Sequence, residues 1–304
     1  MPKSPIILKQ PDGFSVKLYP FLSNNDSPTA NIVLLTGMNE HYGRYNNFIK
    51  FLNSNGFDVY TYDHRGQGKE YSIKDLGYIA PKNGHMLLVN DAISVVDYVS
   101  DNGRGNKTFI IGHSMGSIIT RVVIQNTTKL DGAIVMSTAY EKPSVYFFAK
   151  IITGTVLLFK DGHKPAQYFT KKVFDSKNYN SFGNRTSYDW LSRDVNAVGA
   201  YIHDPYCGYI CSIGFYHDLA SLSYMAALKK NILKTSRSLP ILFVAGTKDP
   251  VGNMGKSVSR LFDVYKSNNF TNIRKIMYKD CRHELLNELN CDHVMEDILN
   301  WLES

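Results

Sequence analysis

Hydrophobic and polar residues alternate along most of this chain in a pattern that predicts strands followed by helices. Short apolar runs, each typical of a buried strand, occupy residues 32–36, 57–62, 108–111, 133–137, 241–245 and 274–278. Between them, apolar residues at helical spacing predict helices over residues 44–54, 85–99, 117–126, 256–265 and 294–302. Ahead of these elements, residues 6–8 and 14–19 flank a Pro-Asp-Gly turn and predict a hairpin. This order predicts an α/β fold, a mostly parallel central sheet with helices on both faces.

The alternation stops between residues 138 and 226. This stretch is rich in aromatic residues, its helical patterns are interrupted, and it has no convincing buried strand. An insertion that returns to the same sheet is best placed over the carboxyl ends of the strands, where ligands bind in α/β folds. We therefore expect two parts of one core, residues 1–137 and 227–304, and an inserted helical lid formed by residues 138–226.

Residues 112–116 are Gly-His-Ser-Met-Gly and lie between a predicted strand and a predicted helix. The G-x-S-x-G pattern in this context is typical of a nucleophile elbow, in which Ser114 stands on a sharp turn above the sheet edge. Glycine on both sides of the serine lets strand and helix approach closely. The alternative interpretation is a glycine-rich turn whose serine has no chemical role.

A serine hydroxyl needs a base to take its proton and an acid to orient that base. His283 is the strongest candidate for the base because it follows the last predicted strand and directly precedes a helix. His113 adjoins the serine, so we expect its side chain to point away from the hydroxyl. His41 and His64 are rivals in nearby loops, and His293 is expected on the surface or in the core.

The acid and the oxyanion donors are predicted from loops at the same edge of the sheet. Asp249 follows the strand at 241–245 and stands between the serine and His283 in chain order, as the acid does behind such an elbow. Its alternative role is an Asx turn. The backbone N–H of Met115, at the start of the helix, is one expected oxyanion donor, and the N–H of Met38, in an early loop, is the second.

Together these residues resemble a known family. The elbow, residues 37–45 (Gly-Met-Asn-Glu-His-Tyr-Gly-Arg-Tyr), 63–68 (Asp-His-Arg-Gly-Gln-Gly) and 204–207 (Asp-Pro-Tyr-Cys), and the loops of Asp249 and His283 are similar to the monoacylglycerol lipase and lysophospholipase family of α/β-hydrolases. That family is grouped with serine aminopeptidase-like proteins. The resemblance implies an α/β-hydrolase fold, Ser114 as nucleophile, Asp249 as acid, His283 as base, and no metal or organic cofactor. One departure is Thr36, where the family usually has histidine before the glycine.

The resemblance also implies residues that bind substrate. Glu40 and Arg44 would hold the glycerol end, and Cys207 could line the pocket. The alternative for the first two is an i,i+4 ion pair at a helix start, worth a few tenths of a kcal/mol. The alternative for Cys207 is an ordinary buried thiol.

Net charge and composition give predictions about metal binding, cellular compartment and membrane contact. The 304-residue chain carries a net charge of +7, and its four cysteines lack paired CxxC spacing, which makes zinc unlikely and favours a reducing compartment. Without an apolar run long enough for a signal peptide or a membrane span, a cytoplasmic protein is expected. Residues 141–180 hold seven lysines and three acidic residues, so +4 of the +7 lies there, around the apolar stretch 145–159. This predicts peripheral contact with anionic membranes, or else a helix packed on the core with solvated lysines.

The expected function is hydrolysis of a lipid ester, a monoacylglycerol or lysophospholipid, through an acyl-enzyme on Ser114. An aminopeptidase-like serine peptidase would need an acidic pocket for the substrate amine, whereas the insertion is basic and apolar. Two more functions fit the same fold, that of a general carboxylesterase and that of a non-catalytic ligand-binding protein. Nothing in the chain predicts a nucleic-acid partner.

Overall fold

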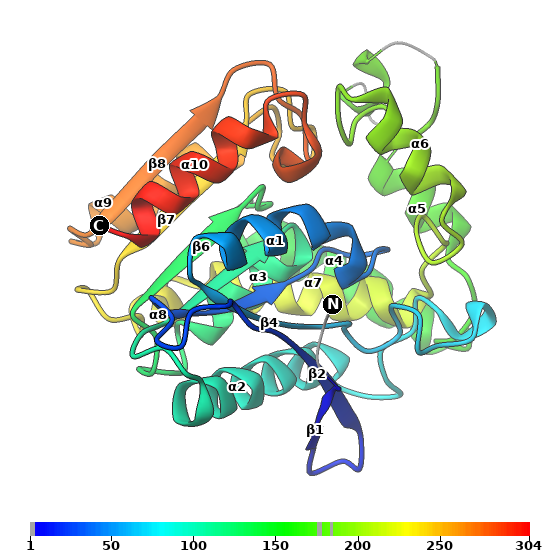
Figure 1. Ribbon diagram of the computed structural model, residues 1–304. Helices are drawn as coiled ribbons and strands as arrows, with labels where there is room; N and C mark the ends of the chain where they lie inside the picture. The colour runs from blue at the N-terminus through cyan, green and yellow to red at the C-terminus, as the bar shows by residue number, and fades with distance from the viewer. Residues whose placement is uncertain (1–3, 175–177, 183–184) are drawn as a thin grey trace.

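A central β-sheet organises the computed structural model, which describes residues 4–174, 178–182 and 185–304 (Figure 1). Within these residues eight strands form one sheet in the order β1-β2-β4-β3-β5-β6-β7-β8. The strands are β1 (Ile6–Lys9), β2 (Ser15–Phe21), β3 (Asn31–Leu35), β4 (Asp58–Tyr62), β5 (Thr108–His113), β6 (Gly132–Met136), β7 (Ile241–Gly246) and β8 (Ile273–Tyr278). Strands β3 to β8 pair in parallel, while β1 and β2 form the predicted antiparallel hairpin, and β2 also pairs antiparallel with β4.

The sheet separates two hydrophobic cores because successive side chains of a strand point to opposite faces. In β3, Val33 and Leu35 face one core, whereas Ile32 and Leu34 face the other. The first core is covered by α2 (Gly84–Asn102), α3 (Met115–Val123), α7 (Ile213–Ala227) and α9 (Lys256–Ser267). The second is covered by α1 (Asn46–Ser54) and α10 (Cys291–Leu302), which lie over the same face of the sheet in Figure 1. The predicted parallel sheet with helices on both faces is confirmed.

Element boundaries differ from the predictions by a few residues. The helix after the serine begins at Met115, two residues earlier than expected, because the turn at Ser114 leads directly into it. The expected helix over residues 44–54 is a 3₁₀ turn, η1 (Tyr42–Tyr45), followed by α1. Two further 3₁₀ turns in connecting loops are η2 (Ile73–Asp75) and η4 (Leu285–Asn287).

The regular elements described between β6 and β7 are helices joined by loops, apart from one isolated bridge between Pro165 and Ser212. They are α4 (Pro143–Leu157), α5 (Gln167–Phe174), η3 (Tyr179–Ser181), α6 (Val195–His203), α7, and α8 (Lys229–Ile232) just after it. Figure 1 shows α5 and α6 together at one end of the molecule. In contrast, α7 packs on α2 and α3 and so belongs to the main core, with α4 packed against it. The division of the chain at residues 138 and 226, and the action of this segment as a lid, remain predictions.

Candidate active site

The carboxyl ends of three parallel strands bring together the serine, the acid and the histidine predicted from the sequence. Ser114 follows β5, Asp249 follows β7, and His283 follows β8. His283 Nε2 lies 2.9 Å from Ser114 Oγ, and its Nδ1 lies 2.9 Å from Asp249 Oδ1. The same carboxylate oxygen accepts the N–H of Val251 at 2.9 Å, so Asp249 makes the Asx turn as well as the contact to His283. A base within hydrogen-bond reach of a hydroxyl, oriented by a buried carboxylate, can activate that hydroxyl as a nucleophile.

Ser114 occupies a strained backbone conformation, with φ of 53° and ψ of −118°. A positive φ is uncommon for a residue with a side chain and is maintained only where the surroundings enforce it. Here the turn is confined by Gly116, where a Cβ atom would lie 2.4 Å from the carbonyl oxygen of Leu35. Because Met115 is the first residue of α3, its N–H has no acceptor within the helix. This N–H and the positive end of α3 suit a developing oxyanion.

The loop after β3 lies directly against the serine. A Cβ atom on Gly37 would lie 3.2 Å from Ser114 Cβ, so Gly37 keeps the backbone of this loop close to the nucleophile. Met38, the second predicted oxyanion donor, follows it and lines the same cavity as Ser114 and Met115. The oxyanion role of the two N–H groups remains a proposal.

Behind this loop, the buried carboxylate of Glu40 accepts several hydrogen bonds. Its Oε1 accepts the N–H of Gly37 and the hydroxyl of Tyr45, both at 2.6 Å, and lies 3.3 Å from His113 Nδ1. Its Oε2 accepts Arg44 Nη1 at 2.8 Å. Although burial acts to raise the pKa of Glu40, the hydrogen bond from His113 and the charge of Arg44 outweigh it and lower the pKa. Glu40 is therefore ionised and braces the loop that precedes Met38.

His113 points away from the serine hydroxyl, as predicted, and both of its ring nitrogens face acceptors. Nδ1 lies 2.8 Å from the hydroxyl oxygen of Tyr45, which donates its own proton to Glu40, and Nε2 lies 3.3 Å from the carbonyl oxygen of His283. Two donated hydrogen bonds require the imidazolium form. Burial acts to lower the pKa of His113, but the hydrogen bond and charge of Glu40 raise it overall. His113 thus connects the loop after β3 to the loop that carries His283.

Arg44 lies behind two carboxylates of the cavity wall. Its guanidinium contacts Glu40 and makes a bidentate ion pair with Glu284, with Nη2 at 2.7 Å from Oε2. Glu40 and Glu284 line the cavity, and both of their charges are paired with Arg44. This is the internal ion pair considered as the alternative for Glu40 and Arg44, while their contact to glycerol remains a proposal. Cys207 packs in a small apolar cluster, and its neighbour Gly208 lines the cavity.

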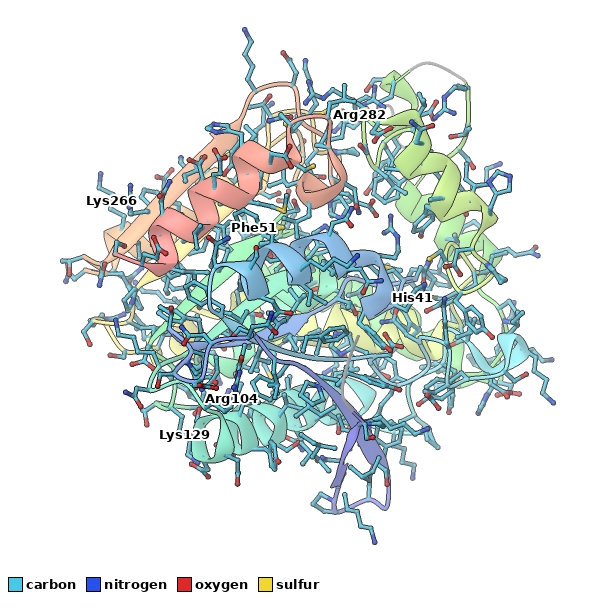
Figure 2. All side chains as sticks on the ribbon, in the orientation of Figure 1. His41, Phe51, Arg104, Lys129, Lys266 and Arg282 are labelled. Atoms are coloured by element: carbon cyan, nitrogen blue, oxygen red, sulfur yellow. The ribbon has the colours of Figure 1, made fainter. Side chains whose placement is uncertain are left out.

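The helical insertion contacts the loop of His283. The N–H of Glu284 donates to the carbonyl oxygen of Leu191 at 2.8 Å, and Arg282 Nη1 donates to the carbonyl oxygen of Ser192 at 2.9 Å. Figure 2 shows Arg282 at the end of the molecule where this loop and the insertion meet. The Trp190 ring lies 5.4 Å from the His283 ring, centroid to centroid. The insertion therefore forms part of the wall around the base.

A cavity of about 760 Å³ opens at Ser114. One wall is largely apolar and comes from α4 and α7, with Tyr146, Ala149, Ile152, Leu219, Ala220 and Ser223. Another comes from the insertion between residues 186 and 209 and includes Tyr188, Trp190, Leu191 and Tyr201. Such a volume and lining suit an organic molecule with a long apolar part.

Comparison with known proteins places these features in a family. The chain matches the Hydrolase_4 family, described as serine aminopeptidase, S33, over residues 26–290. The chain belongs to this family. Among its relatives, the monoacylglycerol lipase of Mycolicibacterium smegmatis is 25% identical over 295 residues, covering 94% of this chain and 92% of that protein. The monoglyceride lipase of Homo sapiens is 27% identical over 289 residues, covering 91% of this chain and 83% of that protein.

Solved structures show the same fold. A thermostable carboxyl esterase from Bacillus coagulans, solved in complex with glycerol, superposes with a TM-score of 0.89 at 23% identity, covering 99% of this chain and 97% of that one. The expected α/β-hydrolase fold and the resemblance to monoacylglycerol lipases are confirmed. This Hydrolase_4 member is therefore a hydrolase of the serine type.

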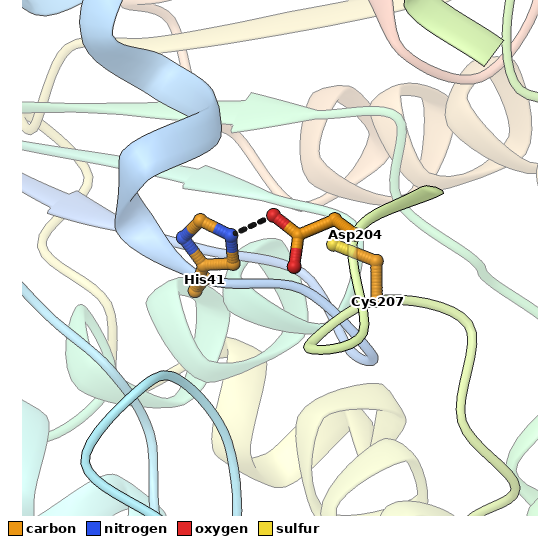
Figure 3. A group of neighbouring side chains, drawn as sticks. All are labelled: His41, Asp204 and Cys207. Atoms are coloured by element: carbon orange, nitrogen blue, oxygen red, sulfur yellow. Dashed lines mark hydrogen bonds and ion pairs between the residues drawn. The ribbon is translucent and has the colours of Figure 1, made fainter. Parts of the chain in front are cut away.

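The hydrolase has one cluster of side chains, among the residues that the structure describes, with the composition of a metal site. Potential ligand atoms of His41, Asp204 and Cys207 lie within 4.8 Å of one another (Figure 3). However, the N–H of Gly43 donates to His41 Nδ1 at 3.1 Å, and the opposite Nε2 lies 2.9 Å from Asp204 Oδ2 and donates to it. A neutral imidazole that binds a metal through Nε2 carries its proton on Nδ1, where the Gly43 N–H already points. We conclude that His41 caps η1 and links it to the insertion, toward which it lies in Figure 2.

The other rival, His64, and the histidine expected on the surface or in the core, His293, also have structural partners. His64 is buried and its Nε2 donates to the carbonyl oxygen of Thr36 at 3.2 Å, while burial lowers its pKa to about 4. His293 is exposed and lies 3.6 Å from Asp297. Three residues that support the site were not predicted from the sequence: Tyr45, Glu284 and Ser137. The hydroxyl of Ser137 donates to the carbonyl oxygen of His283 at 2.7 Å. Only their position next to predicted site residues, or directly after a strand, could have indicated them.

Proposed function

We propose that this hydrolase cleaves carboxylic esters of lipids, with monoacylglycerols as the favoured substrates, through an acyl-enzyme on Ser114. The observation that supports the proposal most strongly is the continuous contact from Ser114 through His283 to Asp249, at 2.9 Å and 2.9 Å, at the opening of a largely apolar cavity. The names of its relatives as monoacylglycerol and monoglyceride lipases support the same substrate class.

The proposed reaction has two steps. Ser114 Oγ attacks the ester carbonyl while His283 Nε2 takes its proton, and Asp249 stabilises the imidazolium. The N–H groups of Met38 and Met115 hold the oxyanion, and His283 then protonates the departing alcohol. Water activated by His283 attacks the acyl-enzyme and releases the fatty acid and the free serine.

The cavity wall supports an acyl chain and a neutral head group. The surface formed by α4 and α7 would take the acyl chain, because burial of apolar area drives its binding. At the polar part of the wall, the guanidinium of Arg44 is held by Glu40 and Glu284, so it is not free to bind a phosphate. This arrangement favours the glycerol of a monoacylglycerol over the phosphodiester of a lysophospholipid.

A peptidase is the second candidate because the family description names a serine aminopeptidase. Such an enzyme needs unpaired carboxylates for the substrate amine. Glu40 and Glu284 reach the cavity, but their pairing with Arg44 leaves little charge for an ammonium group. The geometry therefore favours an ester with an apolar acyl group.

We also propose that α4 rests on anionic membranes. None of the helices in the described residues is long and apolar enough to cross a bilayer. Phe148 in α4 and Leu158 and Phe159 just after it are nevertheless 61%, 78% and 83% exposed, and Lys150 and Lys160 are close to them in the sequence. Apolar residues flanked by lysines suit an interfacial position. Phe148→Glu should abolish co-sedimentation with anionic vesicles at low salt, and absence of wild-type binding to such vesicles would reject the proposal.

A substrate panel with one common acyl chain tests the function. We expect turnover of the monoacylglycerol to exceed that of the lysophosphatidylcholine, and we expect no turnover of an aminoacyl arylamide. Ser114→Ala should reduce activity by several orders of magnitude, on the order of 10⁶ as in a serine protease. Preferred cleavage of the arylamide would support the peptidase. Ligand binding without turnover of any member of the panel would support a binding protein.

A further inference from the structure

The loop between β4 and η2, with the sequence Asp-His-Arg-Gly-Gln-Gly at residues 63–68, supplies none of the residues that act in the proposed reaction. Its backbone turns inward at Gln67, whose neighbours Gly66 and Gly68 have φ values of 68° and 80°. A Cβ atom on Gly68 would lie 1.9 Å from the carboxylate of Asp63, so only glycine fits there. Gln67, between these two glycines, is completely buried.

The Gln67 amide holds the backbone on both sides of Met38. Its Nε2 donates to the carbonyl oxygen of Gly37 at 3.1 Å, and its Oε1 accepts the N–H of Asn39 at 2.7 Å. Oε1 also accepts the hydroxyl of Tyr209 at 3.2 Å. One planar amide therefore bridges two successive peptide groups, and this requires both a donor and an acceptor on the same side chain.

Peptide geometry gives this bridge a chemical consequence. The carbonyl of Gly37 and the N–H of Met38 belong to one planar trans peptide, in which the two groups point in opposite directions. A donor that holds the carbonyl from one side thereby turns the Met38 N–H to the other side. Met38 and Ser114 line the same cavity.

The peptide between Thr36 and Gly37 is also held, through both its carbonyl oxygen and its N–H. The carbonyl oxygen of Thr36 accepts His64 Nε2 at 3.2 Å, and the N–H of Gly37 donates to Glu40 at 2.6 Å. Gln67 holds the next two peptides, through the carbonyl oxygen of Gly37 and the N–H of Asn39. The peptide planes of the loop after β3 therefore cannot rotate without breaking buried hydrogen bonds. The backbone is thus fixed even though Thr36 replaces the histidine usual at that position.

We propose that Gln67 is a positioning residue that aims the Met38 N–H at the oxyanion formed on the substrate of Ser114. This inference rests on the proposed function, because it assigns Gln67 a role in the stabilisation of that oxyanion. Gln67 contacts neither substrate nor nucleophile in this role. Its loss should therefore weaken the transition state more than the binding of the substrate.

The test compares Gln67→Leu and Gln67→Glu with the matched control Gln125→Leu. Gln125 is also a buried glutamine with a hydrogen bond to a backbone carbonyl, that of Ala226 at 3.3 Å, but it lies after α3 and away from the oxyanion loop. Gln67→Glu keeps the acceptor for Asn39 and replaces the donor to Gly37 by an oxygen. The measurements are kcat and KM for a p-nitrophenyl ester at about pH 8, the inhibition constant of a trifluoromethyl ketone with the same acyl group, and the urea midpoint.

Loss of a whole oxyanion donor lowers kcat by about 10²–10³-fold, so a misdirected donor should lower it by about 10–100-fold. We expect both Gln67 variants to show this loss, with KM changed by less than about 3-fold and ketone affinity reduced in parallel with kcat/KM. Gln125→Leu should retain wild-type values. The two Gln67 variants provide separate tests, since Gln67→Glu preserves side-chain shape if Gln67→Leu fails to fold.

Three results would overturn the inference. Wild-type kcat and ketone affinity in a folded Gln67 variant would show that the bridge does not aim the donor. An equal loss in Gln125→Leu would show that any buried glutamine has this effect through stability alone. If the wild type itself neither hydrolyses the ester nor binds the ketone, the proposed function fails and the inference fails with it.

Discussion

Replacement of Glu40 by glutamine separates the two roles open to its carboxylate, a contact to substrate glycerol and an internal brace for the oxyanion loop. Among the described residues four donors surround the carboxylate, from Gly37, Tyr45, Arg44 and His113, at 2.6 to 3.3 Å. Glutamine has the same shape but a single oxygen, so at least one of these donors must then face an N–H group. If the carboxylate is an internal brace, Glu40→Gln should lower the free energy of unfolding even when no substrate is present.

The size of this loss of stability follows from the ion pairs. Removal of one partner from a buried pair costs about 3–5 kcal/mol. Arg44 keeps its bidentate contact with Glu284, so we expect the lower end, a loss of about 3 kcal/mol in the free energy of unfolding. Urea denaturation measures it. The control Glu141→Gln removes a half-exposed pair with Arg260, 3.0 Å apart, and should cost less than about 1 kcal/mol.

Activity distinguishes the brace from the glycerol contact. For Glu40→Gln we expect kcat/KM to fall by a similar factor, about 10–100-fold, for a monoacylglycerol and for the methyl ester of the same fatty acid, because both reactions need the oxyanion loop. A direct contact to glycerol predicts a loss for the monoacylglycerol alone, since a hydrogen bond to a charged group is worth about 1.5–3 kcal/mol. Wild-type stability together with such a selective loss would refute the brace role.

Three further predictions concern stability, pH and chain length. Phe243→Ala in β7, where the ring is fully buried and lies 5.3 Å from that of Tyr265, should cost about 3–5 kcal/mol in urea denaturation, and a loss below about 1 kcal/mol would contradict the packing. Glu40 raises the pKa of His113 above 6.5, so their pairing stabilises the fold fully below about pH 6.5 and less as the pH rises through the higher folded-state pKa. Urea midpoints should therefore fall toward about pH 9 in the wild type and not in Glu40→Gln, whereas equal profiles would contradict the pairing. Ala220→Phe adds a ring to the cavity wall formed by α4 and α7, so the acyl-chain length of the best p-nitrophenyl ester substrate should become shorter. An unchanged dependence of activity on acyl-chain length would contradict the proposed acyl site.

The core could be predicted because its signals are local. Strands β3 and β5 to β7 are buried on both faces and appear in the sequence as short apolar runs. The elbow is equally local, since the glycines and the serine lie within five residues of one another. Chain order behind the elbow then indicated Asp249 and His283, which the structure brings within 2.9 Å contacts.

The insertion and the supporting network could not be predicted in the same way. The apolar residues of α4 lie both toward α7 and toward solvent, so periodicity does not reveal which side packs. Arg44 and Glu284 are 240 residues apart, and Gln67 and Gly37 are 30 apart, so their contacts depend on how the loops meet in the fold. Sequence spacing contains no signal for such pairs. Their residue types were visible, but their partners were not.

Labelling with a fluorophosphonate, with the adduct located by peptide mass spectrometry, is the direct test of Ser114 as the nucleophile. We expect an adduct on Ser114 in the folded protein, formed in parallel with the loss of ester hydrolysis and absent in Ser114→Ala. His283→Ala should form it far more slowly, because the base that contacts Ser114 at 2.9 Å is gone. A folded protein that hydrolyses lipid esters without labelling at Ser114, or a Ser114→Ala variant that retains activity, would show that Ser114 is not the nucleophile.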